Sequence, residues 1–474
     1  MGQEITKTRF QPSDFSRFRR ALARETRQLE QTLTREPPTG DACFAGFELE
    51  ACLVDKNTLL PSAINETFLS RLSHQPITPE LAAFNIEFNT PVFPLQKNIL
   101  TDTEQSLATT LQAARKTAGE LGAEVTYCGI LPTLRDTDLT EANMSKMKRY
   151  RALNEQVLSS RHGTPLKLDI NGRQHITSVH CNVMLEAAAT SFQIHLQTPY
   201  AEFTRHYNAA LVISSPLLAA SPNSPLLFGK QVWEETRIPL FEQAVALGGY
   251  DGAASGPLHR VSFGSGYLQT SVIEAFHENL EHYPPLLPIV DDKTQPYAHL
   301  RLHNGTLWRW NRPLVGFDAD GSLHIRLEHR SLPGGPSIPD MVANAALFYG
   351  LTHYYATTDY RPIEFATARD NFYQAARFGP AAKLRGFGNQ RTAARDLLLD
   401  RLIPEAAEGL ARLQLATGDI EHYLGIIEER LTSGQTGAVW QRRVLKKYNG
   451  DLARLTRRYI ELQQSGQPVH EWAI

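Results

Sequence analysis

Four segments of this 474-residue chain alternate polar and apolar side chains with the period of a β-strand. They are Gly46–Glu50, Phe84–Asn89, Phe192–Gln197 and Leu323–Arg330. Successive side chains of a strand lie on opposite faces, so each segment would have one polar and one apolar face. The chain therefore needs a sheet that packs its apolar face on the core and keeps a polar face for another use.

The polar faces of these segments carry Glu, His, Arg, Asn and Gln, and no Lys. They consist of Glu48 and Glu50; Asn85, Glu87 and Asn89; Gln193, His195 and Gln197; and His324, Arg326, Glu328 and Arg330. A solvated face of an ordinary antiparallel sheet would explain any one strand, but such faces tend to carry Lys, Thr and Ser. Clustered carboxylates repel one another unless cations neutralise them. The four faces together therefore predict a site for a divalent metal ion and a negatively charged ligand.

Composition excludes several classes of protein. The chain has 48 Lys and Arg against 50 Asp and Glu, a net charge of −2, so it lacks the basic character of a nucleic-acid binder. We find no long uncharged apolar run that predicts a membrane span, and the first residues lack the apolar region of a secretory signal. Four cysteines without a CxxC pair favour a reducing cytoplasm. The oligomeric state is left open.

The order of expected elements is that of an α+β protein with one catalytic unit. We expect an N-terminal helix within residues 1–40, a catalytic domain over 41–388 and a helical segment over 389–474 packed on the same unit. Within these, periodicity predicts helices at 101–121 and 200–214 and strands at 123–128, 177–186, 191–198, 299–303 and 306–310. Asp318–Gly321 is expected to form a turn, and 245–297 to form loops with short helices.

Common nucleotide and hydrolase motifs are absent from the sequence. There is no GxxxxGK[ST] loop, and Gly264–Gln269 lacks the third glycine of GxGxxG. No HExxH, GxSxG or paired-cysteine zinc pattern occurs. If the protein uses a nucleotide, its phosphates must be held by metal ions and arginines rather than by a glycine-rich loop.

An ordered set of motifs over roughly residues 44–385 resembles the glutamate–cysteine ligase superfamily, which includes the bacterial carboxylate–amine ligases. The matching elements are the GxExE strand at Gly46–Glu50, the acid–six–acid pair Glu80 and Glu87, Arg149-Tyr150, the His195 strand, the segment Pro216–Gly229, Glu235–Arg237, the V-E-x-R-like Leu327–Arg330 and the helix Asn371–Gly379. Three departures stand out: Gln193 replaces the first histidine of the HxHxG-like strand, Glu235-Thr236 replaces Ser-x before Arg237, and Asn304–Pro313 matches no familiar family segment.

The resemblance implies a fold and a reaction. The fold would be a curved, mainly antiparallel sheet of the glutamine-synthetase and guanidino-kinase type, with a polar catalytic face and covering helices. The reaction would be an ATP- and Mg²⁺-dependent ligation, with Mn²⁺ as a possible substitute, in which a carboxylate attacks the γ-phosphate and an amine then displaces phosphate to give a γ-glutamyl amide. Glutamate–cysteine ligase is the leading expectation. The alternatives are a ligase for another acid and amine, a guanidino kinase and a non-catalytic nucleotide-binding regulator. Partners would be small molecules, with neither nucleic acid nor membrane.

The resemblance also assigns roles to residues. The metal ligands would be Glu48, Glu50, Glu80, Glu87, His195 and Glu328. The catalytic residues would be Arg330 and Glu328, while Arg149, Arg237 and His195 would bind substrate or ATP. Glu80 lies an odd number of residues before Glu87, so on one continuous strand the two side chains would lie on opposite faces. Pro79 indicates that Glu80 instead lies in the turn before that strand. Trp308 and Trp310 are expected to pack in the core, and His299 and His303 to face solvent.

Overall fold

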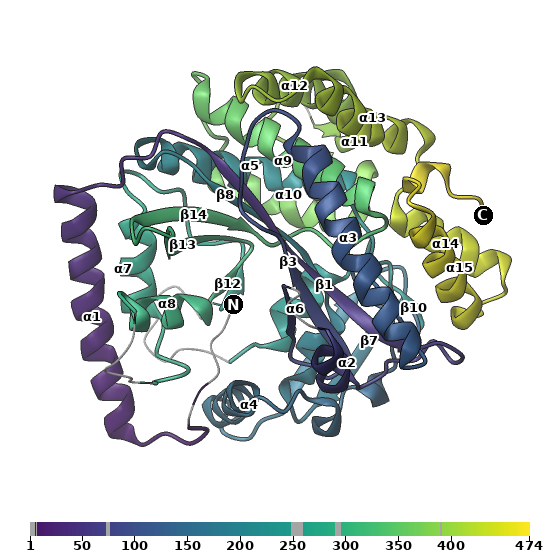
Figure 1. The fold of residues 1–474 in the computed structure, drawn as a ribbon, viewed down its shortest axis with the longest axis horizontal. Coiled ribbons are helices and arrows are strands. Elements are labelled where there is room, and N and C mark those ends of the chain that lie inside the picture. Colours follow the sequence, from purple (N-terminus) through teal and green to yellow (C-terminus); the bar gives the residue numbers. More distant parts are fainter. Residues whose placement is uncertain (1–4, 6, 73–75, 248–258, 290–294, 389–390) are drawn as a thin grey trace.

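The computed structural model describes residues 5, 7–72, 76–247, 259–289, 295–388 and 391–474. Its centre is a curved antiparallel sheet of eight strands with the order β13-β14-β8-β1-β3-β2, in which β4 and β5 also pair with β1 (Figure 1). The strands are β1 (Phe44–Asp55), β2 (Ile77–Pro79), β3 (Asn85–Asn89), β4 (Phe93–Pro94), β5 (Ala123–Thr126), β8 (Phe192–Gln197), β13 (Asn311–Phe317) and β14 (Leu323–His329). The expected fold class is confirmed.

The apolar face of this sheet packs on two buried helices, α5 (Phe203–Ala220) and α9 (Ile338–Thr357). Phe47 and Leu49 of β1 are buried on this side, and the Phe47 ring lies 6.1 Å from that of Tyr349 in α9. Helix α9 is buried over nearly its whole length and carries apolar residues all round, as a helix between two layers requires. One face of the sheet is thus packed on the core. Because side chains alternate along each strand, the polar side chains lie on the opposite face.

The remaining helices surround this pair of layers. They are α1 (Pro12–Arg35), α2 (Asn65–Arg71), α3 (Ile99–Glu120), α4 (Lys148–Ser160), α6 (Arg237–Ala244), α7 (Ile273–His282), α8 (Ala298–Gly305), α10 (Phe365–Phe378), α11 (Ala394–Leu397), α12 (Ile403–Arg412), α13 (Thr417–Ser433), α14 (Gly437–Lys447) and α15 (Leu452–Ser465). Helix α1 stands beside α7 and α8, and the C-terminal helices lie at the opposite side (Figure 1). Among the described helices, none combines the length and apolar character that crossing a membrane demands.

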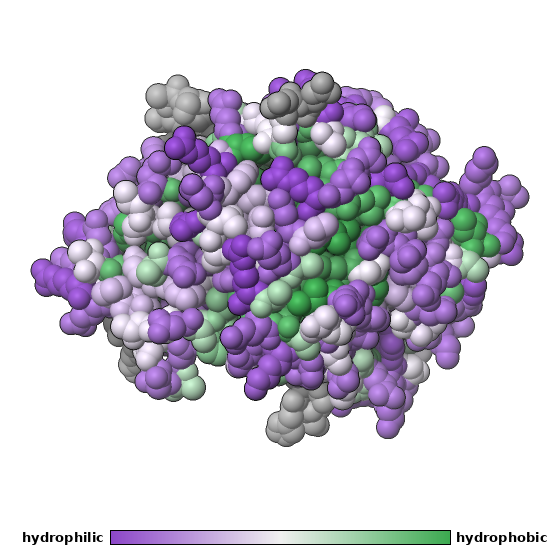
Figure 2. Space-filling view, turned by 90° about the horizontal axis from the view of Figure 1, so that it is seen from above, coloured by the Kyte–Doolittle hydropathy of each residue, from purple (hydrophilic) through white to green (hydrophobic). Residues whose placement is uncertain are grey.

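Short strands and turns complete the chain. They are β6 (Leu166–Asn171) with β7 (His175–His180), β9 (Leu226–Leu227) with β10 (Lys230–Gln231), β11 (Val261–Ser262) with β12 (Trp308–Arg309), and β15 (Lys383–Leu384) with β16 (Thr392–Ala393). Seen from above, the surface is mostly hydrophilic, with a hydrophobic band across its centre (Figure 2).

Two expected strands are wrong. Residues 299–303 belong to helix α8, and both His299 and His303 are buried near Phe18 of α1 instead of facing solvent. The two histidines are four residues apart, so the pattern His-Leu-Arg-Leu-His suits one face of a helix as well as one face of a strand. The expected strand 177–186 ends at His180, and a 3₁₀ turn over Val183–Ala188 follows it.

Several other local predictions are confirmed. Glu80 lies between β2 and β3, where the alternation of a strand does not apply. The turn at Asp318–Gly321 closes the β13–β14 hairpin, with the amide of Gly321 donating to the carbonyl of Asp318. Trp308 and Trp310 are both buried, as expected for packing residues.

Candidate active site

Three of the expected residues meet on the polar face of the sheet. Glu328 of β14 is paired in register with His195 of β8, and β1 carries Glu48 on the other side of the histidine. The Nε2 atom of His195 lies 3.3 Å from Oε1 of Glu48 and 4.0 Å from Oε1 of Glu328. Potential ligand atoms of all three lie within 4.8 Å of one another. Three strands far apart in sequence thus bring two carboxylates and an imidazole to one point.

Glu328 is held by two arginines. Arg312 of β13 binds both carboxylate oxygens, with Nε 2.7 Å from Oε2 and Nη2 3.0 Å from Oε1. Arg330 adds a contact of 3.2 Å from Nη1 to Oε2. Burial alone would raise the pKa of Glu328, but Arg312 and Arg330 outweigh it and hold that pKa well below its usual range. Glu328 is therefore a buried, ionised carboxylate between guanidinium groups.

The hydrogen bonds of His195 define which ring nitrogen carries the proton. Arg326 of β14 donates from Nε to Nδ1 of His195 at 3.2 Å, so in this arrangement Nε2 carries the ring proton and points toward Glu48. A histidine that binds a metal through Nε2 needs the opposite tautomer. Burial would raise the pKa of Glu48, and the attraction to His195 reverses this and lowers it to about 2. The close spacing of Glu48, His195 and Glu328 would suit a cation. The hydrogen bond from Arg326 instead favours a His195 that donates its Nε2 proton and therefore does not bind a metal through that atom.

Glu50 links this cluster to a second one. Its carboxylate accepts from the amide of Ser191 at 2.7 Å and from Nε2 of Gln193 at 2.9 Å. Gln193 in turn accepts a hydrogen bond from Arg330. Burial and the nearby charge of Glu80 raise the pKa of Glu50 to about 7, although Arg330 and Arg237 oppose this. A continuous chain of contacts thus joins Glu50 to Arg330 and Glu328.

The second cluster is a group of mutually repelling carboxylates. Glu87 of β3 is paired in register with Glu50, and Glu80 lies in the turn beyond β2. Burial, Glu48 and Glu80 raise the pKa of Glu87 well above its usual range, and burial also raises that of Glu80. Oxygen ligands in such a group match the preference of Mg²⁺, whose charge would relieve the repulsion. The residues therefore fit a divalent cation here better than at Glu328, whose oxygens are already bound by arginines.

The other two expected substrate ligands have structural contacts. Arg149, in the first turn of α4, stacks on the ring of Tyr150 at 4.5 Å and interacts electrostatically with Glu80 and Glu87. Arg237 donates to the backbone carbonyls of Ser331 at 3.0 Å and of Arg330 at 3.2 Å. Arg237 thus supports the segment that carries Arg330. That either arginine contacts a substrate stays a prediction.

Two residues of the site were not predicted from the sequence. Arg312 could have been found by counting outward from the Asp318–Gly321 turn, because a hairpin closed by the pair Phe317 and Leu323 places Arg312 opposite Glu328. No comparable signal marks Glu186, since it lies in the 3₁₀ turn where alternation predicted a strand.

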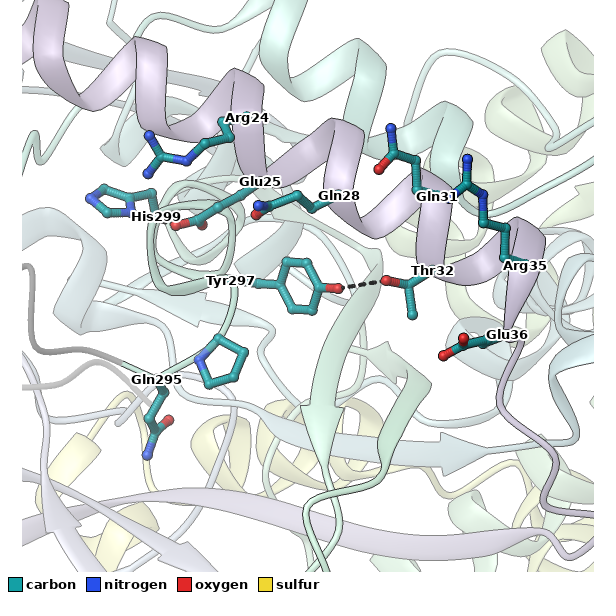
Figure 3. Close-up of a pocket in the computed structure, with 11 residues that line it drawn as sticks. Arg24, Glu25, Gln28, Gln31, Thr32, Arg35, Glu36, Gln295, Tyr297 and His299 are labelled. Carbon is teal, nitrogen blue, oxygen red and sulfur yellow. Dashed lines mark hydrogen bonds and ion pairs between the residues drawn. The ribbon is translucent and has the colours of Figure 1, made fainter.

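Two cavities differ in size and in chemistry. A cavity of about 40 Å³ adjoins the carboxylates and is lined in part by Glu50, Glu80, Glu186, Arg237 and Arg330. A larger cavity of about 630 Å³ lies between α1 and residues 295–299, where Tyr297 bonds to Thr32 (Figure 3). None of the expected site residues lines the larger cavity, and most of the α1 side chains around it are exposed. We place the site at the small cavity, because the unusual charges gather there.

Comparisons with known proteins agree with this geometry. The model of glutamate–cysteine ligase family 2 matches residues 44–458. A crystal structure of glutamate–cysteine ligase from Francisella tularensis in complex with AMP is similar, with a TM-score of 0.54, 12% identity and 90% of each chain covered. A crystal structure of a bifunctional glutathione synthetase from Pasteurella multocida is also similar, with a TM-score of 0.55 and 14% identity. The match covers 94% of this chain and 55% of the Pasteurella chain. A search of curated proteins finds no match. At these identities the solved structures show a shared fold.

Proposed function

Because this chain belongs to glutamate–cysteine ligase family 2 and is a ligase, we propose that it is an ATP- and Mg²⁺-dependent carboxylate–amine ligase acting through an acyl-phosphate. Glutamate and cysteine are the first acid and amine to test. The observation that carries the proposal is the pairing of a carboxylate cluster with guanidinium groups on one face of the sheet: Glu50, Glu80 and Glu87 on one side, Arg312 and Arg330 on the other.

The arginines would act on the phosphoryl group that is transferred. Phosphoryl transfer is accelerated mainly by positioning and by cations that stabilise the charge of the transition state. Arg330 suits this role because its guanidinium is permanently charged and is held by Glu328 and Gln193. Arg312 would maintain the charge and orientation of Glu328. His195 would orient Glu48, toward which its Nε2 proton points.

The carboxylates would hold the metal. Glu50, Glu80 and Glu87, with Glu48 at the edge of the cluster, offer the oxygens that Mg²⁺ prefers. Burial, and with it the repulsion by neighbouring carboxylates that a cation relieves, raises the pKa values of Glu50, Glu80 and Glu87. The bound cation would neutralise the phosphates of ATP and order them for attack by the substrate carboxylate. AMP in the Francisella protein supports nucleotide binding by this fold.

The test is an assay of the protein with ATP, Mg²⁺, glutamate and cysteine, with γ-glutamylcysteine detected by mass. A ligase releases ADP and phosphate together, and at full rate only when acid and amine are both present. Product with another acid or amine would redefine the substrates. ATP binding without turnover over a broad panel of acids and amines would contradict the proposal, and a stable phosphoguanidine would indicate a kinase.

A further inference from the structure

Glu186 lies beside the proposed reaction site without a partner for one of its oxygens. Its Oε2 atom is buried and has no hydrogen bond to any residue that the structure describes, and its side chain lines the 40 Å³ cavity together with Arg330. Asn85, which is 3% exposed, also lines this cavity, and its buried Oδ1 has no hydrogen-bond partner within the described part of the chain. Two buried acceptor atoms in one cavity are costly unless a ligand or water donates to them.

The turn that carries Glu186 is rigidly held. Asn182 caps its start by accepting from the amide of Met184 at 3.0 Å, and Asn154 accepts from the amide of Val183 at 2.9 Å. Farther along, Asn85 of β3 donates to the carbonyl of Ala187 at 2.9 Å. The turn is therefore fixed both to α4 and to the catalytic sheet, so the position of the Glu186 carboxylate is set before a ligand arrives.

The charges of the cavity indicate the kind of ligand. Glu50, Glu80 and Glu186 line it together with Arg237 and Arg330. The positive charges of Arg237 and Arg330 would repel a second divalent ion in the cavity, but they would attract the oxygens of an acyl-phosphate. The carboxylate of Glu186, which the proposed metal site does not use, suits a positively charged nitrogen next to it. The volume of about 40 Å³ admits an ammonium group but not a whole amino acid, since one water needs roughly 10–15 Å³.

On the premise of the proposed ligase function, we propose that Glu186 binds the nitrogen of the incoming amine substrate and accepts its proton as the amide forms. The ammonium gives one proton to Oε2 of Glu186, and the freed nitrogen lone pair forms the C–N bond at the acyl carbon. The C–O bond to the phosphoryl group breaks, and the second N–H proton leaves with the departing group as hydrogen phosphate. The buried Oε2 of Glu186 in the cavity is placed to take that proton, because no described residue donates to it.

The test compares two nucleophiles in Glu186→Gln and in the wild type. Hydroxylamine is largely unprotonated at neutral pH and traps an acyl-phosphate as a hydroxamate, so it needs no proton acceptor. L-cysteine, or whichever amino acid serves as acceptor, arrives as an ammonium. We expect Glu186→Gln to lose about 10²-fold or more in turnover with the amino acid, and to form hydroxamate at the wild-type rate. Glu155→Gln, on the exposed side of α4, is the matched control and should change neither rate.

Each result bears on the proposal. Equal losses with both nucleophiles would overturn it, because Glu186 would then serve phosphoryl transfer or the fold, and thermal denaturation distinguishes these two. Normal turnover with the amino acid would overturn it as well. Absence of hydroxamate from the wild type with every acid would overturn the proposed function, and the inference with it.

Discussion

Arg312 binds both oxygens of Glu328 across neighbouring strands, with Nε 2.7 Å from Oε2 and Nη2 3.0 Å from Oε1. Glu328 is 2% exposed and Arg312 8%, so the pair is shielded from solvent. Arg312 also donates to backbone carbonyls between residues 304 and 307. The segment that matched no familiar family motif therefore supplies the main cation for the central carboxylate of the site.

Loss of Arg312 should destabilise the fold. Removing one partner of a buried ion pair typically costs ~3–5 kcal/mol because the other charge stays buried, so Arg312→Met should lower the free energy of unfolding by about that amount. Chemical denaturation would measure it. The exposed pair of Lys146 with Glu66 gives the control: Lys146→Ala should cost less than ~1 kcal/mol. A small effect of Arg312→Met would show that Arg330 alone neutralises Glu328.

Arg330→Lys should lower turnover while preserving the fold. Lysine keeps a positive charge near Glu328 but cannot contact Glu328, Gln193 and a phosphate with the fixed geometry of a guanidinium. We expect kcat to fall by roughly 10²-fold with little change in melting temperature. Steady-state kinetics and thermal denaturation of the same preparation would check both. Near-normal kcat would remove Arg330 from the proposed phosphoryl transfer.

Stability without metal should fall as pH rises between about 6.5 and 8. The pKa of Glu50 is raised from 4.5 to about 7 and that of Glu186 from 4.5 to about 8. The folded protein therefore binds more protons than the unfolded chain in this window, and the stabilisation is lost as pH passes through the folded pKa values. Groups with lowered pKa values make stability rise with pH, but only below this window: they are the carboxyls of Glu48 and Glu328 and the buried imidazoles of His206, His303 and His353.

Melting temperatures measured across this range with EDTA would show the decline. Mg²⁺ should raise the melting temperature more at pH 8 than at pH 5, since it binds ionised carboxylates. Glu50→Gln should flatten the profile, because it removes one of the raised groups. A melting temperature that rises with pH in the wild type would contradict the assignment.

Metal binding should depend on the second carboxylate cluster more than on Glu328. We expect Glu87→Gln to weaken Mn²⁺ binding by about 10-fold or more, as is typical when a ligand shell is disturbed. Titration calorimetry with Mn²⁺ and ATP would measure the affinity. Glu36→Gln, on the exposed end of α1, should leave it unchanged. Equal affinity in Glu87→Gln and wild type would place the metal elsewhere.

Much of the sheet could be predicted because its strands alternate clearly. Glu48, His195 and Glu328 were assigned to polar faces from period two alone, and the structure brings them together. Alternation does not reveal which strands are neighbours. The antiparallel register of β8 with both β1 and β14 depends on tertiary packing against α9, for example through Phe47 and Tyr349.

The parts that could not be predicted are those where local pattern is ambiguous or absent. Residues 299–303 fit strand and helix equally, and the contact of His299 with Glu25 of α1 decides for the helix. The 3₁₀ turn at Glu186 depends on capping by Asn182 and on its distant partners Asn85 and Asn154. The contacts of arginines depend on distant partners too: Arg237 donates to the backbone carbonyls of Ser331 and Arg330, which no local pattern indicates.

The order of strands in the sheet has a consequence for how the chain folds. The hydrogen bond between Gln193 and Glu50 spans 143 residues of sequence, and that between Arg326 and His195 spans 131. Contacts of such separation close large loops and form slowly. A nascent chain that ends before β13 and β14 would hold the carboxylates of β1 and β3 without Arg312 and Arg330 to offset them. The charged centre can therefore become stable only after the ribosome has passed residue 330, which makes this site one of the last parts of the sheet to form.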